Sequence, residues 1–285
     1  MSGFASIADY RDAQLAGKHH RAHFRKVPGA GFITTAGWWV DMSMVPGNPL
    51  PNYYASSPLV AATLDGFRGI FHGDAKAPST KHLAEVMLMT PTAGFVGEYR
   101  LLDYVMYYPF VDLDDTDTQA MDNSVTLPRY TSGEGLRAML VVTNPTTGGG
   151  SFTFDYVNQA GVQRTAPTQS YGVASANAGM LATSQVATVA GGQEFLRLAD
   201  GDTGMRSIVS WTNLVSNGGL AALVLVKPLA SAQIVEVNTP SEFVFIEQKA
   251  GPPQVVDGAH LNLIMRCAGS VASGTLAGSA AFVWS

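Results

Sequence analysis

Residues 151–158, SFTFDYVN, alternate between apolar and polar side chains, with Phe152, Phe154 and Tyr156 at every second position. Successive side chains of a β-strand point to opposite faces of a sheet, so this spacing predicts a strand with one buried face. Comparable runs of β-branched and aromatic residues recur along the chain between turns that contain Gly, Pro or Asn. Many short strands joined by such turns predict an all-β fold of antiparallel β-sandwich or jelly-roll modules.

Further strands are expected on both sides of this run. Residues 98–110 alternate poorly, which favours burial on both faces of the sheet. Pro228 predicts a turn between two strands. Cys267, the single cysteine, is expected to be a buried inert thiol, and one cysteine excludes an intrachain disulfide. The other predicted strands are 83–91, 135–145, 194–198, 206–212, 220–227, 232–237, 242–247, 260–267 and 275–284.

One helix is expected, at residues 6–17. Ser6 can cap its start, Asp9 follows three positions later, and Gly17 can end it. Its apolar stripe is thin, so the helix needs a partner surface to be stable.

The charge of the chain is uneven. The net charge is −5, yet residues 1–27 carry five basic and two acidic residues, which leaves −8 on the remainder. This asymmetry predicts a basic N-terminal arm, residues 1–30, that is extended or helical. We divide the rest into a β-sandwich module at 31–118 and a jelly-roll-like module at 119–285.

The basic arm is expected to bind an acidic partner through Lys18, Arg21, Arg25 and Lys26. His19 and His23 are four residues apart and would share one face of a helix, as paired metal ligands do. No third ligand accompanies them and basic residues surround them, so a metal site is the weaker interpretation. Binding of nucleic acid is not expected, because the body is acidic and the basic cluster lacks interleaved aromatic residues.

The segment 110–130 contains five aspartates. It does not match a calcium-binding EF-hand loop, because position six would be Asp117 and position twelve Asn123, where Gly and Glu are required. We interpret it as a solvated joint between the two modules that could contact a neighbour. A looser cation site at Asp112, Asp114, Asp115 and Asp117 remains the alternative.

The sequence contains no catalytic signature. It has neither the G-x-S-x-G nucleophile motif nor the G-x-x-x-x-G-K-[ST] phosphate loop, and no catalytic residue, metal or cofactor is assigned. The adjacent aromatic pairs Trp38–Trp39, Tyr53–Tyr54 and Tyr107–Tyr108 are each expected to place one ring in the core and one at the surface or at an interface. A sugar-stacking platform is the less favoured alternative, because aromatic side chains more often fill cores.

Charged residues make up only 14% of the chain, against roughly 25% in typical soluble domains. Interface cores are depleted of charge, so this composition predicts an assembly of identical subunits. Among such assemblies we favour a trimer. No stretch approaches the ~20 apolar residues of a membrane span, and the N-terminus lacks the apolar run of a signal peptide. We therefore expect synthesis in the host cytoplasm and no membrane partner.

Residues 108–145, YPFVDLDDTDTQAMDNSVTLPRYTSGEGLRAMLVVTNP, resemble a stretch of tailed-bacteriophage virion proteins. The matching features are Tyr-Pro, the D-x-D-D-T-D-x-Q segment, D-N, T-L-P-R-Y, and a Gly-rich turn into a strand that ends in T-N-P. The following SFTFDYVNQAG resembles the next hairpin of those proteins. The resemblance covers about a fifth of the chain.

The resemblance implies a virion structural protein of the phage head, of the decoration or cement type, with the major capsid protein as partner and no catalytic residues. Two alternatives remain open: a tail or adsorption protein that binds host glycans, and the major shell protein itself. A glycan hydrolase is the weakest candidate, since it needs two carboxylates facing one cleft about 5 to 10 Å apart.

Overall fold

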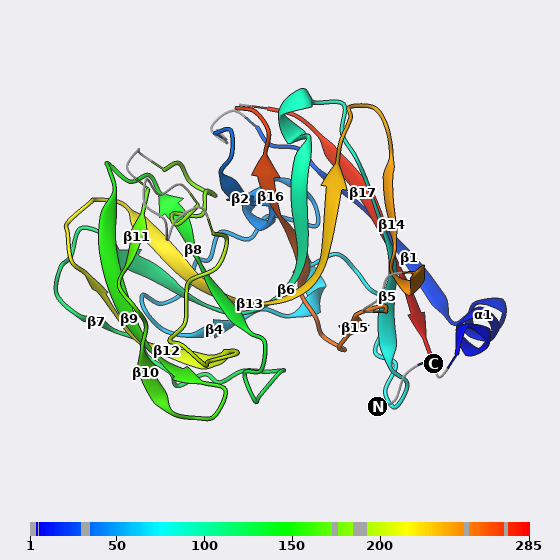
Figure 1. The fold of residues 1–285 in the computed structure, drawn as a ribbon, viewed down its shortest axis with the longest axis horizontal. Coiled ribbons are helices and arrows are strands. Elements are labelled where there is room, and N and C mark those ends of the chain that lie inside the picture. The colour runs from blue at the N-terminus through cyan, green and yellow to red at the C-terminus, as the bar shows by residue number, and fades with distance from the viewer. Residues whose placement is uncertain are drawn as a thin grey trace.

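The computed structural model of the 285-residue chain describes Phe4 and residues 6–29, 35–172, 176–184, 193–247, 251–270 and 273–285. Within these residues almost all regular structure is β, and the described strands pair antiparallel in three sheets, named here A, B and C. Figure 1 shows sheet C at one end of the molecule and sheet A, flanked by one helix, at the other. The all-β antiparallel fold expected from the alternation is confirmed.

Sheet A brings the two ends of the chain together. Its central strand is β17, Leu276–Trp284, and one neighbour of β17 is β1, His19–Lys26, which pairs with it along the full length of β1. The remaining strands are β14 (Ser241–Val244), β5 (Lys81–Met89), β3 (Gly47–Asn48) and β15 (Gln254–Val255), in the order β14-β5-β17-β1-β3, with β15 on β5.

Sheet B is the centre of the molecule, and sheet C forms the opposite end. Sheet B has the order β2-β16-β6-β13-β8, with β4 on β6, and sheet C has the order β10-β9-β12-β7, with β11 on β9. Sheet B comprises β2 (Trp39–Asp41), β16 (Leu261–Cys267), β6 (Gly97–Asp112), β13 (Leu220–Ile234), β8 (Arg137–Asn144) and β4 (Ala62–Thr63). Sheet C comprises β10 (Gln163–Thr165), β9 (Gly150–Asn158), β12 (Met205–Asn213), β7 (Gln119–Ala120) and β11 (Gln169–Tyr171). Short 3-10 helices are η1 (Met42–Met44), η2 (Gly66–Arg68), η3 (Ala93–Phe95) and η4 (Phe245–Glu247).

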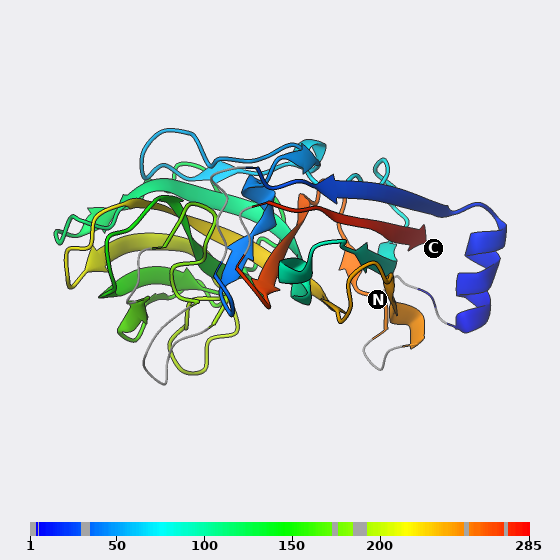
Figure 2. The same cartoon turned by 90° about the horizontal axis from the view of Figure 1, so that it is seen from above.

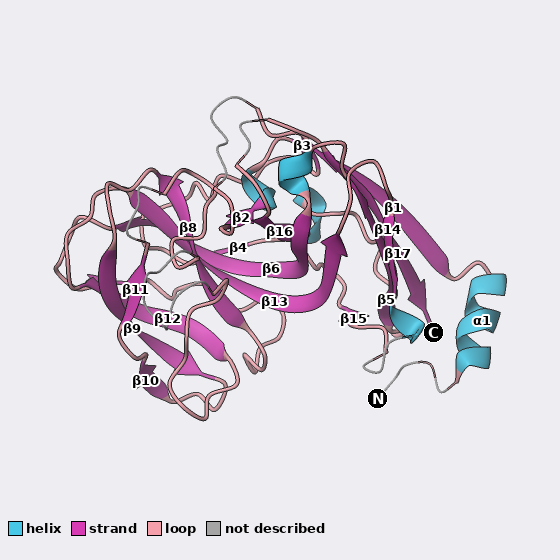
Figure 3. Ribbon diagram, turned by 45° about the horizontal axis from the view of Figure 1, so that its top comes forward, coloured by secondary structure: helices cyan, strands magenta, loops and turns pink. Residues whose placement is uncertain are grey.

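The two longest strands, β6 and β13, pair over their whole length and join the two ends of the molecule (Figures 1 and 3). Leu101 and Val105 of β6 lie in the main hydrophobic core, whereas Leu102 and Tyr104 lie in a second cluster. The segment is therefore buried on both faces, as its poor alternation predicts. At the sheet C end, the rings of Phe152 and Trp211 stack with centroids 4.2 Å apart.

The expected helix is present as α1, Ile7–Leu15. Ser6 caps it by accepting a hydrogen bond from the Asp9 backbone at 3.1 Å, and Gly17 follows with a φ of 72°. Figure 2 shows α1 at the far end of sheet A, crosswise to β1 and β17. No helix among the described residues is both long and apolar enough to span a bilayer.

Some predicted boundaries were wrong. Pro228 does not end a strand, because β13 continues through it and absorbs the missing N–H at a register shift between Pro228 and Ala230. Residues 194–198 form no strand. The described residues of the expected extended or helical arm, Phe4 and residues 6–29, contain α1 and β1, and β1 is a strand of sheet A. Residues 1–3, 5 and 30 lie outside the described residues.

The division into modules 31–118 and 119–285 stays a prediction. Sheets A and B both contain strands from the two sides of that boundary: β5 pairs with β17, and β6 lies between β13 and β16. Residues 31–34 of the first module lie outside the described residues.

Candidate interaction surface

The basic segment of the chain is the strand β1, and its alternation sorts its side chains to two faces of sheet A. His19, Arg21, His23 and Arg25 are exposed on the side away from the core, here called the outer face. The intervening side chains point inward, where Ala22 and Phe24 join the main core. A strand therefore brings His19 and His23 to one face, as the helical reading would have done, but with Arg21 between them.

Cross-strand pairing extends this outer face over the neighbouring strands. Arg21 lies in one row with Ala281 and Glu85, and His23 lies in the next row with Ser279 and Met87. Arg25 continues the pattern with Ala277 and Met89, and β14 adds Glu242 beside Met87. The outer face thus carries basic side chains along β1, small side chains in the middle and acidic side chains toward β14.

Among the described outer-face residues of β1, Arg21 is the one whose side chain forms hydrogen bonds with neighbouring side chains. Its Nη1 and Nη2 donate to the two carboxylate oxygens of Glu85 at 2.6 and 2.8 Å, and Nη1 also donates to Ser279 at 3.0 Å. The hydrogen bond with Glu85 raises the pKa of Arg21. His23 and Arg25 are exposed, so they are the more available groups for a partner.

Lys26, one of the four basic residues assigned to partner binding, is buried, with 1% of its surface exposed. Its ammonium donates to the carbonyls of Pro49 at 2.8 Å and Val45 at 3.2 Å. Burial lowers the pKa of Lys26 to about 8, although the charge of Asp41 opposes the shift. Lys26 anchors the loop that leads to β3, and the exposed Lys18 lies before β1 in the turn that follows α1.

The helix α1 covers only one end of the outer face. Tyr10 and Ala13 are its buried residues, and they pack against Ala84 of β5 and Val283 of β17. Ile7 and Leu15 are 75% and 79% exposed. The helix therefore presents aliphatic side chains to solvent at the border of the outer face.

The aspartate segment folds on its own backbone. The carboxylates of Asp112 and Asp115 accept hydrogen bonds from the backbone N–H groups two residues later, at 2.9 and 2.8 Å. Asn213, which is buried in β12, donates to the carbonyls of Asp112 and Asp115. The exposed side chains of Asp114 and Asp117 fit the expected solvated segment. Nowhere in the described ranges do three His, Cys, Asp or Glu side chains gather as a metal site requires.

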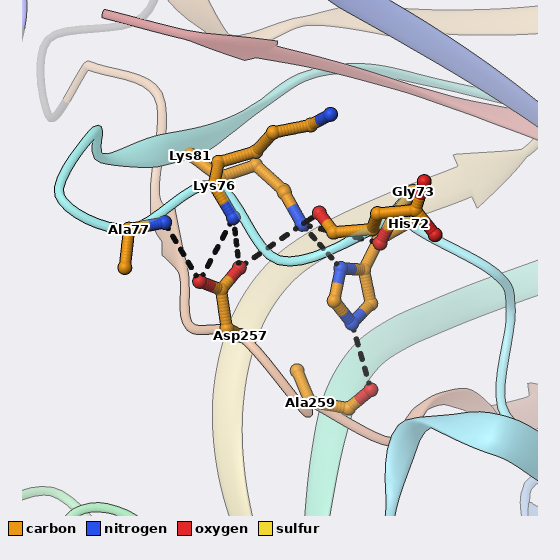
Figure 4. A network of polar contacts seen from close by, with 8 residues as sticks. His72, Gly73, Lys76, Ala77, Lys81, Asp257 and Ala259 are labelled. Carbon is orange, nitrogen blue, oxygen red and sulfur yellow. Dashed lines mark hydrogen bonds and ion pairs between the residues drawn. The ribbon is translucent and has the colours of Figure 1, made fainter.

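A buried lysine cluster, drawn in Figure 4, resembles a catalytic centre in composition. His72 Nε2 lies 3.0 Å from the carbonyl of Ala259, which can only accept, so Nδ1 carries a lone pair toward Lys81 Nζ at 2.9 Å. Lys81 also donates to the Asp74 carbonyl at 3.0 Å and to Asp257 at 3.3 Å. Burial lowers the pKa of both Lys81 and His72.

The rest of this cluster is structural. The Asp257 carboxylate also accepts hydrogen bonds from the backbone N–H groups of Lys76 and Ala77. These bonds hold the carboxylate in place. With its three protons donated to acceptors, the ammonium of Lys81 has no lone pair for attack on a substrate. The cluster ties the loop before β5 to the segment before β16.

The resemblance motif T-L-P-R-Y contains Arg129, which sequence reasoning did not single out. Its guanidinium forms a two-pronged pair with Asp103 of β6 and donates to the carbonyls of Leu64 and Tyr104 at 2.8 and 2.6 Å. Asp103 is fully buried and also accepts from the His260 backbone at 2.8 Å. The motif therefore fixes the segment after the aspartates onto sheet B.

The three adjacent aromatic pairs differ in how many of their rings are buried. Tyr53 is 58% exposed and Tyr54 is buried, as predicted. Both rings of Trp38–Trp39 and of Tyr107–Tyr108 are buried, so the prediction of one surface ring was wrong for these two pairs. The reason is that sheet B has a hydrophobic cluster on each face, and the two members of a pair enter different clusters.

No protein-family model matches this sequence, and no curated protein matches it. Among solved structures, the crystal structure of an infectious bursal disease virus VP2 subviral particle aligns with 93% of this chain and 80% of that chain. The sequence identity is 8% and the TM-score is 0.14. A TM-score this low does not indicate a shared fold.

Proposed function

We propose that this protein is a structural component of a tailed-phage virion, a decoration or cement protein that attaches to the head through the outer face of sheet A. The observation that carries the proposal is the resemblance of residues 108–145 to tailed-phage virion proteins. Its partners are the major capsid protein and further copies of itself, with a trimer as the favoured state. The protein needs no cofactor and catalyses no reaction in this role.

The character of the outer face supports this proposal. Two exposed basic residues of β1, His23 and Arg25, lie across β17 from the half-buried methionines Met87 and Met89 of β5, and the small residues of β17 keep the centre flat. Apolar and small side chains with a few charges at the edge suit a stable protein interface, because charge is depleted at interface cores. The cationic row along β1 would meet acidic groups of a shell protein.

The polarity of the face also supports contact between copies. The cationic row lies along β1, and Glu242 lies at the opposite side of the sheet on β14. In a two-fold contact each surface patch meets its own copy, so a patch with opposite charges at its two sides is self-complementary. In a trimer the cationic row of one copy would meet the acidic side of the next.

Electron microscopy tests the proposal directly. Antibodies against the purified chain are applied to virions of the tailed phage that encodes it, with gold-labelled second antibody. Label spread over the heads is expected. Label confined to tails would support the adsorption alternative. A virion role would be refuted if the virions carried no label and mass spectrometry detected no peptide of this chain in them.

A further inference from the structure

The strand β1 has an unpaired edge over most of its length. On one side it pairs with β17 at every residue, whereas on the other side β3 pairs only with Arg25 and Lys26. After β3 the chain turns beneath the sheet, since the carbonyl of Pro49 accepts a hydrogen bond from the ammonium of the buried Lys26 at 2.8 Å. Figure 2 shows β1 along the border of sheet A, beside β17.

Two hydrogen bonds at the ends of β1 show which backbone groups face this edge. In an antiparallel sheet, successive residues of a strand bond alternately to the neighbour on one side and to the neighbour on the other. Trp284 donates to the Lys18 carbonyl at 3.2 Å, and Val27 donates to the Pro46 carbonyl at 2.8 Å. The even-numbered residues of β1 therefore bond to β17, and the backbone groups of the odd-numbered residues point the other way.

The open edge runs from residue 19 to residue 23. The N–H and C=O groups of His19 and Arg21 and the N–H of His23 face it, and none of the described residues forms a hydrogen bond with these groups. The carbonyl of His23 accepts from the Asn48 side chain at 3.1 Å, which marks the end of the edge. The three side chains are exposed on the outer face. A row of unpaired backbone groups is a template for an added strand.

The side chains along the edge select the partner. In antiparallel pairing, two residues that exchange hydrogen bonds lie opposite each other and point to the same face. Acidic residues of an added strand would therefore lie opposite His19, Arg21 and His23 on the outer face. Lys18 and Arg25, both exposed, flank the edge, so pairing with the β1 of a second copy would gather basic residues against basic residues. The occupant that fits is an acidic segment of another protein.

The inner side of the edge is partly apolar. His20 and Ala22 point inward, and the ring of Phe71 lies edge-on against His20 with centroids 5.3 Å apart. Phe71 is 55% exposed, so it offers apolar surface beside this strand. The inward-facing residues of an added strand would lie beside His20 and Ala22, and apolar side chains suit that position.

We propose that residues 19–23 bind an extended segment of a partner protein as an added antiparallel strand, with acidic side chains on the outer face and apolar side chains on the inner face. Backbone hydrogen bonds supply affinity in this binding mode, and alternate side chains supply specificity. The binding mode follows from the open edge, whereas the shell protein as the source of the segment rests on the proposed head attachment.

Fluorescence anisotropy of a labelled peptide of alternating Glu and Val tests the proposal, with the full chain and without phage heads. Methylation of the Glu nitrogens removes the N–H groups that would face β1, because the residues opposite His19, Arg21 and His23 exchange the hydrogen bonds. Methylation of the Val nitrogens leaves those N–H groups in place and is the matched control. A peptide of alternating Lys and Val tests the preference for acidic side chains.

Arg21→Pro tests the edge from the side of the protein. It removes the outward N–H, and proline is tolerated where the N–H of an edge strand faces solvent. Arg21→Ala is the matched control, because it also loses the ion pair with Glu85 but keeps the N–H. The thermal unfolding curves of the two variants are compared first. If Arg21→Pro unfolds, the methylated peptides with the wild type still decide the question.

The Glu peptide and its Val-methylated form are expected to bind the wild type, and methylation of the Glu nitrogens should weaken binding at least about tenfold. Arg21→Pro should bind the Glu peptide at least about tenfold more weakly than Arg21→Ala does. Binding of neither peptide, equal binding of the two methylated forms, or equal binding of the Lys and Glu peptides would overturn the proposal.

A wild-type dimer that Arg21→Pro dissociates would also overturn it, since a second copy would then occupy the edge. Because the peptide measurements contain no heads, their failure contradicts the added strand alone. Failure of the chain to sediment with heads contradicts the proposed attachment instead.

Discussion

Arg129 and Asp103 form a two-pronged ion pair beneath the surface of sheet B, with Nε to Oδ2 at 2.8 Å and Nη2 to Oδ1 at 2.5 Å. The side chain of Asp103 is fully buried and that of Arg129 is 9% exposed. The pair joins the T-L-P-R-Y motif to β6, and its backbone partners lie at Leu64, Tyr104 and His260. A contact that connects so many segments holds them in place against β6.

Arg129→Met is expected to lower the free energy of unfolding by about 3 to 5 kcal/mol, because it leaves the buried carboxylate of Asp103 without its counter-charge. Urea unfolding followed by fluorescence measures the change. Arg11→Met is the control: Arg11 pairs with Asp12, but both side chains are more than 60% exposed, so a change below about 0.5 kcal/mol is expected. Equal effects of the two substitutions would contradict the structural role of Arg129.

The lowered pKa of the buried Lys26 should make the stability of the folded chain depend on pH. Its pKa in the folded chain is about 8, against 10.5 as the ordinary value. Between these two values the unfolded chain holds a proton that the folded chain has lost, so raising the pH stabilises the folded state. Below pH 8 both states are protonated and the cost of burying the ammonium is fully present.

Lys26→Met should therefore remove this slope, which approaches about 1.4 kcal/mol per pH unit for one group. The measurement is the difference in unfolding free energy between the wild type and Lys26→Met from pH 7 to 10. The difference should stay constant up to pH 8 and then grow in favour of the wild type. A constant difference across the whole range would show that Lys26 titrates as an ordinary lysine.

Asn213 is predicted to hold the aspartate segment in place. Its side chain donates to the Asp112 and Asp115 carbonyls and accepts from the Trp211 indole at 2.8 Å. Asn213→Ala leaves several buried groups unpaired, so a loss of about 2 to 4 kcal/mol in unfolding free energy is expected. Asn144→Ala, at an exposed position in β8, should change it by less than about 0.5 kcal/mol. A similar small change at both sites would refute this role.

The aspartates themselves are expected to tolerate replacement. Asp114, Asp115 and Asp117 are exposed, and the asparagine oxygen can accept the same backbone hydrogen bond that Asp115 accepts. The triple substitution to Asn should keep the melting temperature, and millimolar CaCl2 should change neither protein. A calcium-dependent rise in melting temperature that the triple variant lacks would establish the cation site that the sequence left open.

The local signals in the sequence predicted local structure well. The Ser6 cap and Gly17 placed α1, and the alternation of residues 151–158 placed β9. The strand β1 was not predicted, because its alternation is masked by basic residues on both faces. One face carries Arg and His, and the other carries His20 and Lys26 beside Ala22 and Phe24. Only pairing with β17, from the far end of the chain, makes that segment a strand in the interior of a sheet.

The surroundings of His260 could not be predicted from spacing. Asp65 and His260 lie far apart in the sequence, yet His260 is buried and its Nδ1 lies 2.6 Å from the Asp65 carbonyl. The Tyr53–Tyr54 pair did predict its own arrangement, since an adjacent aromatic pair exposes one ring when only one side is covered. The sequence gave no signal that Arg129 forms a buried ion pair, because its partner Asp103 lies inside a run of apolar residues.

The most direct test of the proposed attachment is co-sedimentation with purified phage heads. Deletion of residues 1–27 is unsuitable, because it removes β1 from the interior of sheet A. His23→Glu with Arg25→Glu instead reverses the charge of the outer face, and Gln163→Glu with Arg164→Glu makes the same change in charge on exposed residues of β10. We predict that the wild type and the β10 variant pellet with heads, and that the β1 variant stays in the supernatant. Equal pelleting of the two variants, or none by the wild type, would contradict attachment through the outer face.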